Sequence, residues 1–317
     1  MAYAGKGDVT TAERLLKDAG FTVSETCCSR PSCFDFAARK GQSLIFVKVI
    51  SDLDRLSVGD LVELKNVARS VSGNSLLISQ ECRDRSLEDD TVYRRQDVSA
   101  VTLKTFENIT KRGIYPLIQA GPGGYYVEID GEAIRKRRQE LGLSVGKMAE
   151  MISISRRTLY GYEQGMAKAS VGAAYNMIYT LGIPVAKPVN IFEKPKAKRR
   201  KCKLLSTAKN ALEKNRFLTR IFRRLDRYHV TTTRKAPFDF IITVSEEKMR
   251  IIGGVATDKE QALDRRIEEI TSVSRVVHAH PLLIADEPKS MNKEISVIQK
   301  KNLTKIKTPE ELLSNIT

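Results

Sequence analysis

Arginine and lysine side chains gather in the middle of the sequence, where they could bind phosphate groups or the edges of bases. Residues 131–190 hold nine basic and four acidic residues, including the run Arg135–Arg138 and the neighbouring Arg156 and Arg157. A guanidinium group presents a fork of donors that matches the O6 and N7 acceptors of guanine, and it also binds phosphate without regard to sequence. The whole chain carries 54 Lys and Arg against 38 Asp and Glu, a net charge of +16. This charge favours a polyanionic partner, although many basic proteins bind no nucleic acid.

Residues that could hold a metal ion or carry catalysis are sparse by comparison. Cys27, Cys28 and Cys33 cluster, but no histidine lies near them and their spacing matches no common zinc site, so we expect buried thiols. Five cysteines, an odd number, argue against a disulfide framework. The sequence has no phosphate-binding glycine loop and no Ser-His-Asp set. We therefore expect no cofactor, no metal site and no catalytic residue.

Short helices are expected to position the central basic residues. The spacing predicts helices over Glu132–Leu141, Val145–Ile152, Arg156–Gln164 and Ser170–Leu181. Ser144 and Ser155 are suited to cap the second and third helices, and Gly165 is suited to end the third. Apolar side chains of these two helices and the turn between them can face each other in a small bundle: Met148, Ala149, Ile152, Ile154, Leu159 and Tyr162.

This segment resembles the lambda-repressor/Cro (XRE) type of helix-turn-helix (HTH) through Ala149, Ser155, Leu159, Glu163 and Gly165. In that family the third helix enters the major groove of double-stranded DNA. The resemblance implies phosphate contacts by the capping serine and a following lysine, and base contacts by the residues between them. The implied DNA-binding residues are Ser155, Arg156, Arg157, Tyr160, Gln164 and Lys168.

The segment departs from the family pattern at two positions. Val145 stands where the family often has a glutamine that contacts phosphate. Gly161 stands at another base-reading position and offers no side chain there. Because one recognition helix reads few bases, the resemblance also implies a homodimer on symmetric half-sites.

Two similar stretches lie on either side of the central segment. CFDFAARKGQSLIFVKV begins at residue 33, and PFDFIITVSEEKMRIIGGV begins at residue 237. LVELKNVARSVSGNSLLIS then matches IEEITSVSRVVHAHPLLIA at a constant offset of 206 residues, with seven apolar positions aligned. The ends DVSAVTLKTFENIT and NLTKIKTPEELLSNIT are alike as well. These matches predict an internal duplication.

Each stretch predicts the same order of elements. In the first, the spacing predicts a helix over Thr10–Ala19, strands over Phe21–Ser24, Phe34–Arg39 and Leu44–Ile50, a helix over Val58–Val71, strands over Ser75–Ser79 and Val98–Leu103, and a helix over Thr105–Thr110. This α-β-β-β-α-β order is typical of a layered α/β domain. The expected fold class is therefore α/β plus all-α, with two related α/β domains that flank a Cro-type helical bundle.

The α/β order, with Asp35 on the second strand and Lys48 on the third, resembles the PD-(D/E)XK nucleases. Glu13 on the first helix matches a further acid of some members. Those enzymes hold Mg²⁺ between carboxylates. Phe46 stands where an acid should precede the lysine by two residues, and the second stretch keeps Asp239 but lacks the lysine. We therefore expect degenerate, catalytically silent domains, with a Lys48–Asp35 ion pair in place of a metal.

The predicted parts are an α/β domain over 1–112, a connecting segment with a short strand over 113–130, an HTH domain over 131–192, a basic linker over 193–203 and a second α/β domain over 204–317. The linker carries seven basic residues and one acid, so we expect it to be exposed. No apolar run is long enough to span a membrane and no signal peptide is evident, so a cytoplasmic location is expected.

The whole layout resembles the archaeal helix-turn-helix regulators, in which an α/β domain precedes a Cro-type domain and a further region follows. The resemblance implies a sequence-specific transcriptional regulator that binds double-stranded DNA and is not an enzyme. Two alternatives stay open from the residues alone. One is an active Mg²⁺-dependent nuclease guided by the same helices, and the other is an antitoxin-like interaction protein.

Overall fold

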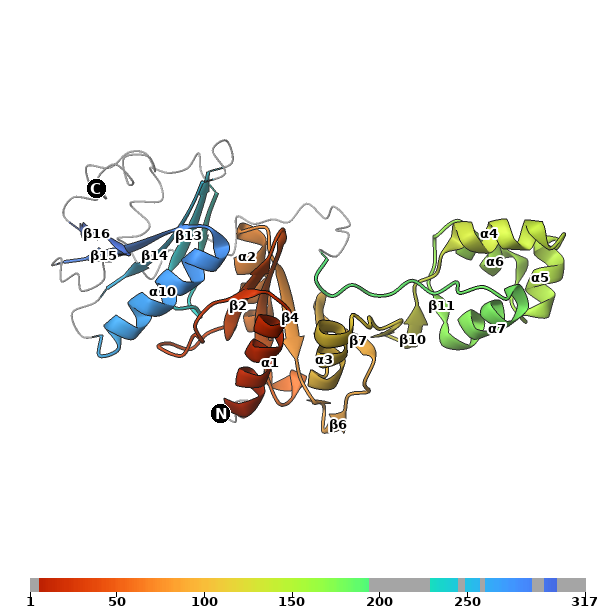
Figure 1. Ribbon diagram of the computed structural model, residues 1–317, viewed down its shortest axis with the longest axis horizontal. Helices are drawn as coiled ribbons and strands as arrows, with labels where there is room; N and C mark the ends of the chain where they lie inside the picture. The colour runs from red at the N-terminus through yellow and green to blue at the C-terminus, as the bar shows by residue number, and fades with distance from the viewer. Residues whose placement is uncertain (1–5, 194–228, 245–248, 257–259, 287–293, 301–317) are drawn as a thin grey trace. The chain divides into compact units, whose positions relative to one another are not determined.

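The computed structural model describes residues 6–193, 229–244, 249–256, 260–286 and 294–300 (Figure 1). These residues divide into two units, one formed by residues 1–77 with 192–317 and the other by residues 78–191. Residues 194–203 of the basic linker and the end NLTKIKTPEELLSNIT of the second stretch lie outside the described residues.

The first sheet of unit 1 is built on an antiparallel pair of strands. β2 (Phe36–Lys40) and β3 (Ser43–Val49) are joined by a tight turn at Gly41, whose φ of +55° suits a residue without a side chain. β1 (Thr22–Val23) pairs with β2, and β4 (Asn74–Ile78) lies next to β3 in the strand order β1-β2-β3-β4. Residues 44–49 are all buried, which explains the nearly continuous apolar run that Lys48 interrupts.

Two helices cover this sheet with apolar faces. α1 (Lys6–Asp18) buries Ala12, Leu15 and Leu16 and contacts β1, while α2 (Val58–Ser70) buries Leu61, Leu64 and Val67 and contacts β3. The Ser57 side chain and the Asp60 carboxylate form a capping box that starts α2, and the short η1 (Leu53–Arg55) precedes it. The expected helices and strands of this region are all present, with ends displaced by a few residues.

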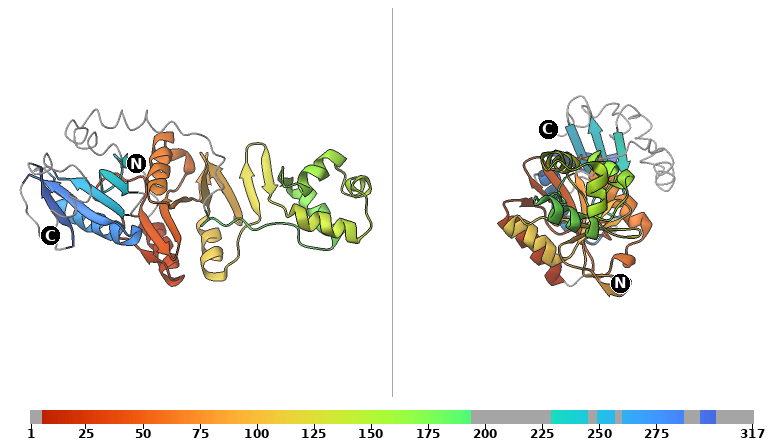
Figure 2. Two further views of the ribbon diagram at one scale, coloured as in Figure 1. Left: turned by 90° about the horizontal axis from the view of Figure 1, so that it is seen from above. Right: turned by 90° about the vertical axis from the view of Figure 1, so that its right-hand side faces the viewer.

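The second sheet of unit 1 is mixed. Its strands are β12 (His229–Thr232), β13 (Phe240–Val244), β14 (Met249–Val255), β15 (His280–Ala285) and β16 (Ser296–Gln299), in that order across the sheet. The first two pairings are antiparallel and the last two are parallel. α10 (Leu263–Val277) lies between β14 and β15 in sequence and contacts both (Figure 2).

Unit 2 begins with a small hairpin of β5 (Glu81–Cys82) and β6 (Arg85–Ser86). A sheet follows with the order β8-β7-β9-β10-β11, made by β7 (Thr91–Arg95), β8 (Val98–Val101), β9 (Ile118–Gly121), β10 (Gly124–Val127) and β11 (Ala169–Ser170). α3 (Leu103–Arg112) connects β8 to β9.

The connecting segment 113–130 differs from its prediction. It was expected to hold one short strand, but it holds the β9–β10 hairpin, with Gly121 paired to Gly124. Pro122 and Gly123 form the turn, and the φ values of +88° at Gly123 and +136° at Gly124 are open to glycine. These glycines therefore belong to the turn of a hairpin.

The cysteine cluster matches its prediction in part. Cys27 and Cys33 are buried, and burial raises the pKa of both thiols, whereas Cys28 is exposed. In the described part of the chain, no group of three or more His, Cys, Asp or Glu residues is arranged to hold a metal ion. Across the same residues, no helix combines the length and hydropathy needed to cross a membrane.

Candidate nucleic-acid interface and nuclease-like positions

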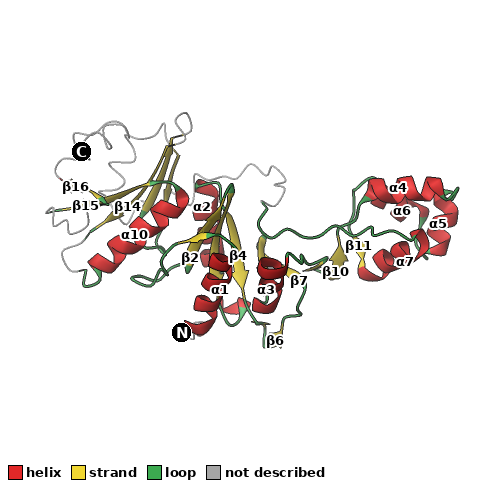
Figure 3. Cartoon of the chain, in the orientation of Figure 1, coloured by secondary structure: helices red, strands yellow, loops and turns green. Residues whose placement is uncertain are grey.

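Four helices of unit 2 form the predicted bundle (Figure 3). They are α4 (Gly131–Glu140), α5 (Val145–Met151), α6 (Arg156–Glu163) and α7 (Val171–Leu181). Ser144 Oγ accepts a hydrogen bond from Lys147 N–H, and Ser155 Oγ accepts one from Thr158 N–H, so both serines cap their helices as predicted. Gly165, with a φ of +65°, follows the end of α6.

The predicted packing of α5 against α6 is confirmed. The apolar residues proposed for this contact are buried or partly buried in one cluster: Met148, Ala149, Ile152, Ile154, Leu159 and Tyr162. Val127 of β10 and Ala169 of β11 belong to the same cluster, so the bundle shares its core with the end of the sheet. Because α6 is held on this side, its opposite side faces outward.

A close approach fixes α4 against the end of α6. A Cβ atom added to Gly131 would lie 2.3 Å from the Tyr162 carbonyl oxygen and 2.6 Å from that of Glu163. Backbone atoms cannot yield as a flexible side chain can, so only glycine fits at this contact. The first turn of α4 is therefore set directly on the last turn of α6.

A buried ion pair strengthens the same contact. Arg138 Nε lies 2.6 Å from Glu163 Oε1, its Nη2 lies 3.1 Å from Oε2, and its Nη1 donates to the Leu143 carbonyl at 2.8 Å. The hydrogen bond to Glu163 raises the pKa of Arg138. The sequence analysis grouped Arg138 with the basic residues that could bind phosphate or bases, and it did not predict this pair. Glu163 in the Glu-x-Gly pattern was the available signal, because a buried carboxylate requires a partner.

The outward side of α6 presents the residues that the sequence proposed for reading bases. Arg156, Arg157 and Gln164 are exposed, and Tyr160 is 54% exposed. Gly161 has open space beside it, since a Cβ atom there would meet nothing within 4 Å. These exposed positions alternate along α6 with the buried Leu159 and Tyr162.

The proposed phosphate contacts are Ser155, the N-cap of α6, and Lys168, which directly precedes β11. Ser155 is exposed, and its Oγ also lies 2.8 Å from Thr158 Oγ1. Lys168 Nζ donates to Gln119 Oε1 of β9, and burial together with the nearby Arg94 lowers the pKa of this lysine. Lys168 is exposed, and its contact with Gln119 holds the end of its side chain beside β9.

The nuclease-like positions of unit 1 form the expected ion pair. Lys48 Nζ lies 2.7 Å from Asp35 Oδ1 and donates to the Ser32 carbonyl at 3.1 Å. Val49 N–H donates to Asp35 Oδ2 at 2.7 Å. Both carboxylate oxygens of Asp35 are therefore engaged within the protein.

The remaining residues do not fit the Mg²⁺ site that the nuclease resemblance implies. Phe46 is fully buried and packs edge-on against Phe34, with ring centroids 5.0 Å apart, so it offers no ligand. Glu13 Oε1 accepts a hydrogen bond from the Thr26 hydroxyl, which gives this carboxylate a partner outside the Asp35–Lys48 pair. A hard divalent cation requires several oxygen ligands, and this set supplies too few.

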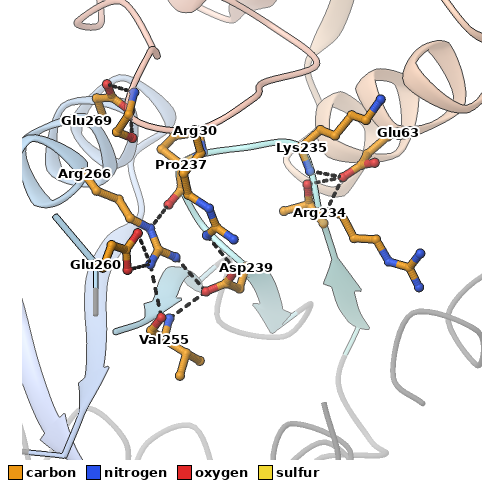
Figure 4. A network of polar contacts seen from close by, with 12 residues as sticks. Arg30, Glu63, Arg234, Lys235, Pro237, Asp239, Val255, Glu260, Arg266 and Glu269 are labelled. Carbon is orange, nitrogen blue, oxygen red and sulfur yellow. Dashed lines mark hydrogen bonds and ion pairs between the residues drawn. The ribbon is translucent and has the colours of Figure 1, made fainter. Parts of the chain in front are cut away.

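Asp239 makes similar hydrogen bonds in the second sheet of unit 1. Asp35 N–H donates to the Val47 carbonyl and Asp239 N–H to the Gly253 carbonyl, each at 2.8 Å. Asp239 Oδ2 accepts from Val255 N–H at 2.7 Å, as Asp35 does from Val49. The cations differ, because Asp239 pairs with Arg266 of α10 and with Arg30 (Figure 4).

Arg266 fills the space that the missing lysine leaves. A Cβ atom on Gly254, which follows Gly253 as Lys48 follows Val47, would lie 2.9 Å from Arg266 Nη2. The Arg266 side chain is 1% exposed and also pairs with Glu260 and donates to the Pro237 carbonyl. No spacing in the sequence indicates this role, since the arginine comes from a helix rather than from the strand.

Comparison with known proteins finds two family models that match different regions of the chain. A model described as a PD-(D/E)XK superfamily domain matches residues 8–116, and one described as Helix-turn-helix matches residues 134–187. The "Putative HTH-type transcriptional regulatory protein" of Pyrococcus furiosus is 30% identical over 97% of this chain and 96% of its own length. That of Methanosarcina acetivorans is 30% identical over 95% of this chain and 93% of its own length.

One solved structure, the SinR protein/SinI protein complex, covers 31% of this chain and 91% of its own at 17% identity. Its TM-score is 0.16, too low to support an argument about fold or partner.

Proposed function

We propose that this chain, which belongs to the archaeal family of HTH-type transcriptional regulatory proteins, regulates transcription by placing α6 in the major groove of its operator. The observation that carries the proposal is the division of α6 into two sides. Leu159, Tyr162 and Glu163 are buried in the bundle, while Arg156, Arg157 and Tyr160 are exposed. A recognition helix needs this division, because one side must be fixed while the other reads bases.

Specificity is assigned to the two arginines at the start of α6. The N-terminal residues of a recognition helix contact base edges, and a guanidinium fork suits guanine. Tyr160 and Gln164 follow Arg156 at intervals of four residues and extend the same surface. Ser155 and Lys168 contact the phosphates that flank the bases.

The regulator acts as a homodimer in this proposal. A single α6 reads too few base pairs to select one genomic site, and two-fold half-sites solve this problem. α7 supports the proposal, since it exposes apolar side chains at helical spacing, with Tyr175 67% and Tyr179 83% exposed. A second copy would bury this strip, together with Val171 and Ile178.

The α/β domains are proposed to be two catalytically silent copies of one fold. The silence is supported by the Asp35–Lys48 pair and by Phe46 in place of an acid. The relationship is supported by Asp35 and Asp239, which have matching backbone hydrogen bonds at the start of the second strand in each sheet. Fold alone does not carry catalysis, so a nuclease-like scaffold can serve a regulator.

Selection of bound fragments from a genomic DNA pool tests the function. The full chain is expected to enrich a small set of fragments that share a two-fold-symmetric sequence, and to leave them uncut in Mg²⁺. Sedimentation of the protein with the enriched DNA should show two chains on each fragment. Enrichment of no common sequence would contradict the proposal, and cut fragments would favour the nuclease alternative.

A further inference from the structure

Two glutamates at corresponding positions of the α/β domains each reach a loop of the other domain. Glu269 on α10 follows Glu63 on α2 by 206 residues. Glu269 Oε1 accepts hydrogen bonds from the N–H groups of Cys28 and Ser29, both at 2.8 Å, and its other oxygen accepts from the Ser29 hydroxyl. This carboxylate is buried, so its stability depends on donors from the first domain.

Glu63 makes the reciprocal contact. Its Oε1 accepts hydrogen bonds from the N–H groups of Arg234 and Lys235, the latter at 2.7 Å, and from the Thr233 hydroxyl (Figure 4). Residues 233–235 precede the second strand of their domain as residues 28–29 precede theirs. Each helix therefore presents a carboxylate to the amides of the partner domain's loop.

The ends of the same two helices show a second reciprocal contact. Arg39 on β2 donates to the carbonyl groups of Val276 and Val277 at the end of α10, at 2.5 and 3.1 Å. Thr243 on β13 donates through its hydroxyl to the Ser70 carbonyl at the end of α2, at 3.0 Å. Thr243 corresponds to Arg39 in strand register, because Arg39 pairs with Leu44 and Thr243 with Arg250.

Between these contacts, two corresponding phenylalanines meet each other. Phe34 and Phe238 each directly precede the aspartate of their domain, both are fully buried, and their ring centroids lie 6.1 Å apart. In a two-fold arrangement, a residue touches its own counterpart only near the axis. Phe34 and Phe238 therefore mark the axis, and the glutamate contacts lie on either side of it.

We propose that the two α/β domains form an internal pair related by an approximate two-fold axis, in which each domain is the binding partner of the other within one chain. The inference builds on the proposed duplication and does not depend on DNA binding. It means that the faces carrying Glu63 and Glu269 are used inside the chain and are closed to a second copy. A homodimer must then form through another surface, such as the α7 strip.

Departures from symmetry have local causes. Cys33 N–H donates to the Lys235 carbonyl at 2.7 Å, but the corresponding donor is absent because Pro237 has no N–H. Arg30 of the first domain reaches Asp239 of the second at 2.9 Å, whereas Asp35 Oδ1 accepts from Lys48 of its own strand. The two domains are thus alike in the contacts of Glu63 and Glu269, but they differ in the cations that pair with Asp35 and Asp239.

Amide hydrogen exchange of the full chain, read by mass spectrometry, tests the pairing. In the wild type, the amides of residues 28, 29, 234 and 235 should exchange at least tenfold more slowly than the exposed amides of the turn at Arg83 and Asp84. Glu269→Ala should speed exchange of residues 28 and 29 about tenfold, and Glu63→Ala should do so at residues 234 and 235, since each loses a charged acceptor. Glu268→Ala, which removes an exposed neighbour, serves as the matched control and should change neither loop.

Three results would overturn the proposal. The first is wild-type exchange in both loops as fast as in the exposed turn, which requires no variant to fold. The second is faster amide exchange only within the domain that carries the substitution. This would be at β15 for Glu269→Ala and at β4 for Glu63→Ala, with no change in the loop of the other domain. The third is loss of protection on dilution, which would assign the contacts to two different chains.

Discussion

Lys48 Nζ lies 2.7 Å from Asp35 Oδ1, and the side chains of the two residues are 8% and 11% exposed. The lysine thus occupies the side of the carboxylate that a divalent cation would need, while the amide of Val49 holds the other oxygen. An ion pair so buried persists only because hydrogen bonds complete it, here from Lys48 to the Ser32 carbonyl as well. In the proposed function, this pair is a structural contact at the place where a nuclease would hold its metal ion.

The Asp35–Lys48 pair should make the first α/β domain inactive as a nuclease. Purified protein should leave linear and branched DNA intact in Mg²⁺ or Mn²⁺, measured by gel electrophoresis with a known nuclease as positive control. Asp35→Ala should lower the free energy of unfolding by about 3–5 kcal/mol, because it leaves the buried Lys48 ammonium without its counter-charge. Cleavage by the wild type that disappears in Asp35→Ala would overturn the proposal of catalytic silence.

The Arg138–Glu163 pair should dominate the stability of the helical bundle. Glu163→Ala is expected to lower the free energy of urea-induced unfolding of unit 2 by about 3 kcal/mol, since it removes the carboxylate partner of a buried guanidinium. The double variant Arg138→Met/Glu163→Leu should recover most of that loss, because no unpaired charge is left. A single-variant cost below about 1 kcal/mol, the range of exposed pairs, would show that water screens this contact.

Two glycines of the bundle should respond in opposite directions to alanine. Gly161→Ala should stabilise the protein by about 0.5–1 kcal/mol, since the site lies inside α6 with open space beside it. Gly131→Ala should destabilise it by about 1–3 kcal/mol, because the new methyl group would overlap the backbone at the end of α6. Thermal unfolding measures the Tm of both variants. Equal changes in Tm would show that the α4–α6 contact is looser than described.

Lys168 should contribute to DNA affinity without contributing to specificity. Lys168→Ala is expected to weaken binding to all sequences about equally and to reduce the salt dependence of log Kd by about one unit, as loss of one phosphate contact does. Titrations at several salt concentrations measure this slope. An unchanged slope together with lower stability would assign Lys168 to its contact with Gln119 alone.

The features that the sequence predicted well are local ones. Ser144, Ser155 and Gly165 lie next to the helix ends that they define, and the apolar spacing of Met148, Ile152 and Leu159 reports the buried sides of those helices. Asp35 and Lys48 lie on adjacent strands joined by a tight turn, so their meeting also follows from local order. Short-range patterns carried this information.

The features that the sequence missed depend on distant partners. Arg266 reaches Asp239 from a helix, and Arg138 reaches Glu163 across the bundle, so neither contact is visible as a spacing. Glu63 and Glu269 are aligned at the 206-residue offset, but a glutamate on a predicted helix is usually an exposed polar residue. Only the docking of the two domains gives them the same role.

The central claim is that α6 reads the operator, and one binding measurement tests it most directly. Fluorescence anisotropy would compare wild type with Arg156→Ala/Arg157→Ala on the enriched genomic fragment and on a scrambled fragment. Loss of base contacts worth ~1–3 kcal/mol each predicts an affinity for the operator at least tenfold weaker, with a much smaller change on the scrambled DNA. Binding of the double variant to the operator as tightly as wild type would contradict the assignment of α6 as the recognition helix.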